Sequence, residues 1–207
     1  MVTDDAVDDG FSMLLQSGFK QCATYESCTW RTLAAAGKPY APSTKAHVHI
    51  NEHLLIGIFK KSDILWRLSS LRPDMNETSA ASDVISASDP SLPGPSISHG
   101  WGALSPLLPY PVHIPSIQRL TEAFILLSVR HTPSLLGYFW QSMICYLVQY
   151  VTKDGLLDHG LLQPHHKRFI EYMEDPGERK TWQIVEELNE KERELSEATA
   201  PIEDTPV

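Results

Sequence analysis

The 207 residues contain only three cysteines, Cys22, Cys28 and Cys145. A number this small and odd excludes a complete framework of intramolecular disulfides. The first ten residues, MVTDDAVDDG, lack the positive charge and the apolar run of a secretory signal, and they are too acidic for a transit peptide. The sequence therefore predicts a reducing compartment, either the cytoplasm or the nucleus.

Basic charge is also scarce, since 17 Lys and Arg stand against 26 Asp and Glu, giving a net charge of −9. No basic stripe with interleaved aromatic side chains is present, so nucleic-acid binding is not expected. The 11 glycines are scattered singly, and neither a phosphate-binding loop nor a Gly-x-Ser-x-Gly nucleophile elbow occurs. These absences count against the common nucleotide-binding and hydrolase classes.

Composition divides the chain unevenly. Residues 69–115 hold ten serines and eight prolines but only five charged side chains, a composition that buries too little apolar surface to order itself. The helical parts on either side are each small, so we expect them to share one core. The predicted parts are a disordered acidic leader (1–10), an N-terminal helical part (11–71), a Ser/Pro-rich linker or insert (72–111), a C-terminal helical part (112–197) and a disordered tail (198–207).

Apolar residues recur at helical spacing through much of the chain. The first such pattern predicts a helix over 11–36. In 45–58, alternation places His47 and His49 on one face of a strand that enters a helix over 53–71, although a single helix fits equally well. Together the patterns predict a mainly α, irregular helical domain of about five or six helices with a long Ser/Pro-rich insert.

The clearest helical signals follow residue 115. A helix over 115–130 ends before Thr132-Pro133, which has the residue types of an N-cap and first position of the next helix. That next helix, 133–152, carries no charge, so we expect it to form the buried centre of the fold, and a membrane span is the less favoured alternative. Two further helices are predicted over 164–174 and 178–197, the last one capped by Asp175.

Two cysteines and two histidines are the candidates for a metal site. Thiolate and imidazole are the ligands that zinc prefers, and Cys22, Cys28, His49 and His53 would supply four of them. Five residues separate the cysteines, more than the usual spacing of about two to four. Buried cysteines with surface histidines therefore remain the alternative interpretation.

Three segments resemble parts of Mob-type kinase adaptors, namely FSMLLQSGFKQCATYESC, LPYPVHIPSIQRL and YLVQYVTKDGLLDHGLLQP. The resemblance implies a zinc-stabilised adaptor domain. The cysteine pair of that family is one residue closer together, and only His131 lies near the place of its histidine pair. The chain is therefore not assigned to that family.

For function, the sequence favours a non-enzymatic protein–protein interaction or regulatory module. The narrow apolar stripe of the 178–197 helix and the Pro-rich 105–115 segment predict contacts with another protein, although the stripe also fits a surface helix of the same domain. One alternative is a small helical enzyme with a histidine-lined pocket, for which His49, Glu52 and His166 are the catalytic candidates. The other is a zinc-stabilised adaptor domain, and zinc is the one cofactor considered.

Overall fold

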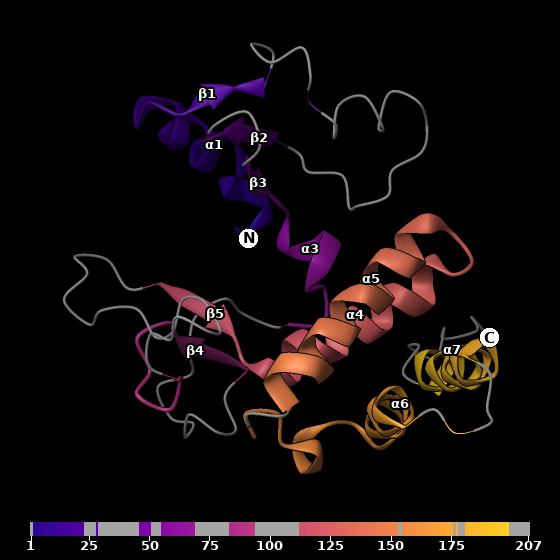
Figure 1. Cartoon of the computed structure of the whole chain (residues 1–207). Helices are drawn as coiled ribbons and strands as arrows, with labels where there is room; N and C mark the ends of the chain where they lie inside the picture. Colours follow the sequence, from indigo (N-terminus) through magenta and orange to yellow (C-terminus); the bar gives the residue numbers. More distant parts are fainter. Residues whose placement is uncertain are drawn as a thin grey trace, which may run out of the picture.

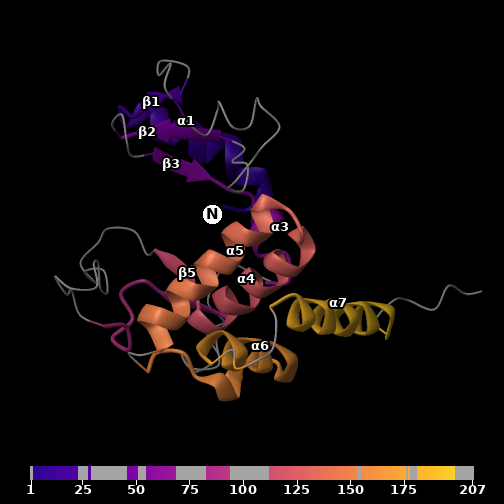
Figure 2. The same ribbon diagram turned by 45° about the vertical axis from the view of Figure 1, so that its right-hand side comes forward.

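The structure, a computed structural model, describes residues 2–22, 28, 46–50, 55–68, 83–93, 112–152, 155–175, 177 and 181–198. Within these ranges the fold is mainly α, as predicted, with six α-helices and five short strands. The helices are α1 (Val7–Gln16), α3 (Lys61–Ile64), α4 (Ile117–His131), α5 (Leu135–Tyr146), α6 (Pro164–Glu174) and α7 (Thr181–Ala198). The strands are β1 (Lys20–Gln21), β2 (Ala46–His49), β3 (Leu55–Ile58), β4 (Val84–Ser86) and β5 (His113–Pro115). Figures 1 and 2 show α1 with β1–β3 at one end of the molecule and the four long helices α4–α7 at the other.

The N-terminal part is an antiparallel sheet of order β1-β2-β3 with α1 beside it. A 3-10 turn, η1 (Asp4–Ala6), leads into α1, so residues 4–10 are helical where a disordered leader was predicted. Aspartates near a helix start are favourable because they face the positive end of its dipole. Gly18 follows α1 with a φ of 90°, a backbone conformation that glycine adopts at little cost. The chain then enters β1, so the helix predicted over 11–36 is wrong at 17–22, and most of its remainder lies outside the described residues.

The alternation of residues around 46–49 forms a strand, as one of the two sequence interpretations predicted. β2 pairs with β3 so that His47 lies opposite Gly57 and His49 opposite Leu55. The helix predicted over 53–71 is wrong, because 55–58 belongs to β3 and only four residues of α3 are helical. In β3 the backbone of this short apolar run forms hydrogen bonds with β2. This pairing favours a strand over the helix that the spacing of its apolar residues predicted.

Part of the predicted Ser/Pro insert has secondary structure. Strand β4 pairs antiparallel with β5, with Val84 opposite Pro115. Val84 is buried against α4. Removing its apolar side chain from water stabilises this contact. Most of the rest of the insert, the Pro-rich 105–111 and the tail from residue 199 lie outside the described residues.

Helix α4 is the centre of the fold, because two apolar clusters meet on it. Ile125 and Val129 belong to a cluster shared with α5, α6 and α7. Ala123 and Leu127 belong to a second cluster shared with the α3 region, β4 and α5. From the sequence we expected helix 133–152 to be the buried centre of the fold, but its residues are more exposed than those of α4.

Helix α5 begins and ends differently from the predicted 133–152 helix. Ser134 is its N-cap and its hydroxyl oxygen accepts the N–H of Gly137, whereas Thr132 closes α4. Gly137 permits close approach of α5 to α4, since a Cβ there would lie 3.0 Å from the carbonyl group of His131. Beyond Tyr146 the helix widens into a π-helical segment, η3 (Leu147–Thr152).

One face of α5 is exposed. Trp140 and Ile144 are buried on the side facing α4. The opposite side, which we term the tyrosine face, has exposed fractions between 48% and 59% and consists of Leu135, Tyr138, Tyr146 and Tyr150. No helix among the residues described here has both the length and the apolarity to cross a membrane.

Helices α6 and α7 complete the core. The predicted bounds of α6 are confirmed, and its Phe169 and Ile170 are fully buried. Asp175 ends α6 instead of capping α7, which begins at Thr181. Three apolar residues of α7 pack on α4 and α6 of the same chain, so this part of the predicted stripe is covered internally; they are Ile184, Val185 and Leu188.

We expect Phe169→Ala to lower the free energy of unfolding by about 3–5 kcal/mol, because it removes a fully buried ring and leaves a cavity. Urea denaturation followed by circular dichroism measures the change. Tyr138→Ala is the matched control on the exposed face and should change stability by less than about 0.5 kcal/mol. Equal effects of the two substitutions would contradict the assignment of the core.

Candidate functional site

The first candidate site lies on the N-terminal sheet. Alternate residues of a strand share a face, so His47 and His49 project to the same side of β2, with ring centroids 5.6 Å apart. Strand β1 pairs with β2 so that Lys20 lies opposite His49 and Gln21 opposite Val48. Continuing this register by one residue brings Cys22 beside His47.

Four ligand atoms converge at this place. The Sγ atoms of Cys22 and Cys28 and one ring nitrogen each of His47 and His49 lie within 4.8 Å of one another. Cys22, Cys28 and His49 are buried, and neither cysteine forms a disulfide. Cys28 Sγ lies 3.4 Å from His47 Nε2. Sulfur and nitrogen ligands of a tetrahedral zinc ion are separated by about 3.5 Å, given bonds of about 2.3 and 2.0 Å. The spacing therefore fits zinc.

The ionisation of His47 suits metal binding. Burial lowers the pKa of His47, and repulsion from His49 lowers it further. A neutral imidazole has the lone pair that a metal ion requires. His47 is therefore held in the form that binds metal near pH 7.

The structure brings together three residues of the predicted metal set, and the fourth, His53, lies outside the described residues. Cys22, Cys28 and His49 converge, and His47 joins them. Glu52 also lies outside the described residues. The sequence did place His47 and His49 on one strand face, and that alternation was the signal for His47 as a ligand.

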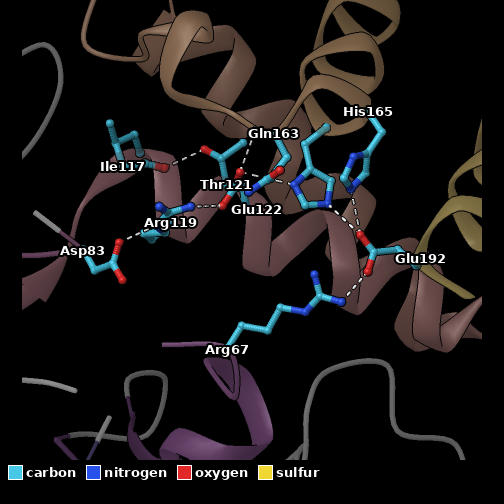
Figure 3. A network of polar contacts seen from close by, with 10 residues as sticks. Arg67, Asp83, Ile117, Arg119, Thr121, Glu122, Gln163, His165 and Glu192 are labelled. Atoms are coloured by element: carbon cyan, nitrogen blue, oxygen red, sulfur yellow. Dashed lines mark hydrogen bonds and ion pairs between the residues drawn. The ribbon is translucent and has the colours of Figure 1, made fainter. Parts of the chain in front are cut away.

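The second candidate site surrounds a buried carboxylate on α4, that of Glu122 (Figure 3). Oε2 of Glu122 accepts a hydrogen bond from Arg119, which also donates to Asp83 beside β4. Oε1 accepts the backbone N–H of Gln163 at 2.8 Å and lies 3.3 Å from Nδ1 of His166. The Glu122 side chain thus contacts both α6, at His166, and the residue that precedes it, Gln163.

Glu122 stays ionised. Burial by itself would raise its pKa, but the contacts with His166, the Gln163 N–H and Arg119 together lower the pKa to about 2. A buried carboxylate with these partners carries a full negative charge at neutral pH. The charge of this buried carboxylate therefore depends on its contacts with Arg119, the Gln163 N–H and His166.

A second buried carboxylate, that of Glu192 on α7, extends the network. Its Oε1 lies 2.8 Å from Nε2 of His165 and 3.3 Å from Nε2 of His166, and its Oε2 binds Arg67. Burial lowers the pKa of His165 and His166 lowers it further, while Glu192 acts in the opposite sense. His165 is thus held towards its neutral form.

A cavity of about 250 Å³ adjoins this network, and its polar lining includes Arg67, Arg119, Glu122, Gln163 and His166. Of the catalytic candidates from the sequence, His166 borders this cavity. His49 belongs to the Cys/His cluster instead, so the two histidines take part in different clusters.

Glu122 and Glu192 were missed by sequence reasoning. The available signal was an acidic side chain among apolar residues, as in Thr121-Glu122-Ala123 on a helix whose other residues are mostly apolar. Such a residue is buried only when it is paired, so it points to a polar network without naming its partners.

We expect Glu122→Gln to destabilise the protein by about 3 kcal/mol, because it removes the buried negative charge that pairs with Arg119 and the Gln163 N–H. Thermal and urea denaturation measure the loss. Glu194→Gln on α7 is the matched control, since Glu194 is exposed and pairs with the exposed Lys191 in a contact of little net energy. A Glu122 variant as stable as the control would show that the buried network contributes nothing.

The comparisons with known proteins add no relative. No protein-family model matches the chain, and searches of curated proteins and of solved structures find no similar chain. The functional inference therefore depends on the geometry of the two clusters.

Proposed function

We propose that this chain is a zinc-stabilised, non-enzymatic interaction domain. The observation that supports the zinc site is the convergence of four thiol and imidazole ligand atoms within 4.8 Å. Zinc accepts this ligand set in tetrahedral geometry. Four protein ligands leave no open coordination position, which is typical of structural sites and not of catalytic ones.

The N-terminal sheet has a physical need for such a site. Its strands have two to four residues each, and its buried aliphatic side chains among the described residues before Phe59 are Val7, Val48 and Ile58. So few apolar contacts stabilise a small unit poorly, and natural proteins commonly add a metal or disulfides. A zinc ion would join Cys22, Cys28 and the two histidines of β2, and so tie the sheet together.

We expect the purified protein to contain zinc bound by Cys22, Cys28, His47 and His49. Cys22→Ser or His47→Ala should remove this zinc and lower the melting temperature, because a three-ligand site binds zinc more weakly. Cys145→Ser is the matched cysteine control, since Cys145 is exposed and remote in sequence. Elemental analysis and thermal denaturation with and without a chelator provide the measurements.

His53→Ala separates the two proposed ligand sets. If His47 is the fourth ligand, this variant keeps its zinc, whereas loss of zinc from it would favour the set derived from the sequence. Folded protein whose metal content and stability do not depend on the two cysteines would refute the zinc site.

The interaction surface that we propose is the tyrosine face of α5 and η3. No charged residue occurs from Thr132 to Thr152. Tyr146 and Tyr150 stack with centroids 6.2 Å apart and an interplanar angle of 17°, both exposed. Tyrosine is enriched at protein interfaces because its ring buries much area with little loss of entropy. We propose as partner another protein with an uncharged, apolar surface.

A photo-crosslinking amino acid placed at Tyr138 or Tyr146 tests this surface. We expect each to form a discrete crosslinked species in cells, and the same label at exposed Glu190 on α7 to form none. Indistinguishable crosslinking from the three positions would contradict the tyrosine face as the contact surface. Circular dichroism of each labelled protein verifies that the fold is kept.

A further inference from the structure

The Cys/His cluster does not account for the second group of metal-binding side chains, which lies between α6 and α7. One ring nitrogen each of His165 and His166 and a carboxylate oxygen of Glu192 lie within 4.8 Å of one another there. Figure 3 shows His165 and Glu192 pointing towards one another from their two helices. Consecutive residues of a helix normally project about 100° apart. Here the two adjacent histidine rings nevertheless lie with centroids 4.2 Å apart and meet the same carboxylate oxygen.

His166 is the observation that points to a ligand. Its side chain is 1% exposed, and neither ring nitrogen makes a hydrogen bond of good geometry. The nearest acceptors are Oε1 of Glu122 and Oε1 of Glu192, each at 3.3 Å. A buried polar group without good hydrogen bonds costs free energy, so a bound cation that takes up a ring lone pair would relieve that cost.

One oxygen of each carboxylate faces the histidines, and that of Glu122 also accepts the Gln163 N–H. The other oxygen of Glu122 is held by Arg119, and that of Glu192 by Arg67. With a metal ion on Nε2 of His166, the proton on Nδ1 would face Glu122, whose Oε1 lies 3.3 Å away. This carboxylate–histidine arrangement is the one that commonly orients a histidine ligand towards a metal ion.

The distances suit a transition-metal ion. Nitrogen and oxygen ligands bound at about 2.1 Å in tetrahedral geometry are separated by about 3.4 Å. The contacts of Glu192 Oε1 with the two histidine nitrogens measure 2.8 and 3.3 Å, so little side-chain movement would be needed to admit an ion. Imidazole and carboxylate together suit zinc, cobalt, nickel, copper and iron better than calcium or magnesium.

We propose that His165, His166 and Glu192 form a second metal site, which binds one divalent transition-metal ion between α6 and α7. Glu122 is its positioning residue and acts through His166. Three protein ligands leave at least one position open, unlike the four-ligand cluster of the N-terminal sheet. Because His166 also lines the 250 Å³ cavity, this cavity adjoins the proposed site.

The experiment loads purified full-length protein with Co²⁺ after removal of bound metal. Native mass spectrometry counts the ions, and absorption spectra identify their ligands, since thiolate ligands add charge-transfer bands in the near ultraviolet that imidazole and carboxylate lack. We expect two ions in the wild type and one in Cys22→Ser/Cys28→Ser, the remaining ion having visible bands without thiolate charge transfer. We expect Glu192→Gln and His165→Asn to lose this ion and to keep the thiolate bands.

His159→Asn is the matched control, because His159 pairs with Glu174 outside the site and its loss should leave both ions in place. Glu122→Gln should weaken Co²⁺ binding by about 10- to 100-fold without abolishing it, as expected of a residue that orients a ligand. If the double cysteine variant fails to fold, the number of ions bound by the wild type and by Glu192→Gln still tests the second site. One bound ion with thiolate bands, unaffected by Glu192→Gln, would overturn this proposal and leave the N-terminal zinc site intact.

Two ions without thiolate bands, insensitive to Cys22→Ser, would instead contradict the proposed N-terminal site and leave the second site standing. The two failures are thereby distinguished in one set of proteins. Folded protein that binds no Co²⁺ would contradict both.

Discussion

The charge of one buried carboxylate constrains the arrangement of the helical part. Glu122 lies on the most buried helix, where an unpaired charge would be strongly unfavourable. Arg119, the backbone N–H of Gln163 and His166 are positioned to stabilise it. Since Arg119 also holds Asp83, the same requirement links β4, α4 and α6, and through His166 it extends to α7.

The two ends of the molecule are stabilised in different ways. The helical end has two apolar clusters on opposite sides of α4, with Phe169, Ile125 and Ile144 fully buried. Among its described residues the sheet end has few large buried side chains, and four potential ligand atoms cluster beside β2. A metal ion at the sheet would therefore affect whether that end folds, whereas one between α6 and α7 would affect an already packed interface.

Much of the fold follows from the sequence where local patterns decide it. The helical spacing of 117–131 and the Pro164 start of α6 are local features, and both helices form as expected. The helix predicted over 11–36 is wrong at 17–22, because Gly18 turns the chain into a strand whose partner is about 30 residues away. Helix α5 was expected to be central because it is uncharged, yet absence of charge does not distinguish a buried face from a tyrosine-rich exposed one.

The candidate sites divide in the same manner. Cys22, Cys28 and His49 were predictable from residue type, and His47 from strand alternation. The Glu122–His166 contact joins positions on separate helices, and no spacing rule connects α4 with α6. A buried acid indicates that partners exist, but only the packing of the helices determines which ones.

The contact between Arg67 and Glu192 has a consequence for the order in which the chain folds. It joins residues 125 positions apart, and the segment between them includes the Ser/Pro-rich stretch. Closing so long a loop has a high entropic cost, which is recovered only when α4, α5 and α6 are already packed. During synthesis Arg67 leaves the ribosome long before Glu192, so we expect α7 to dock last and to be the first long helix to detach on mild unfolding.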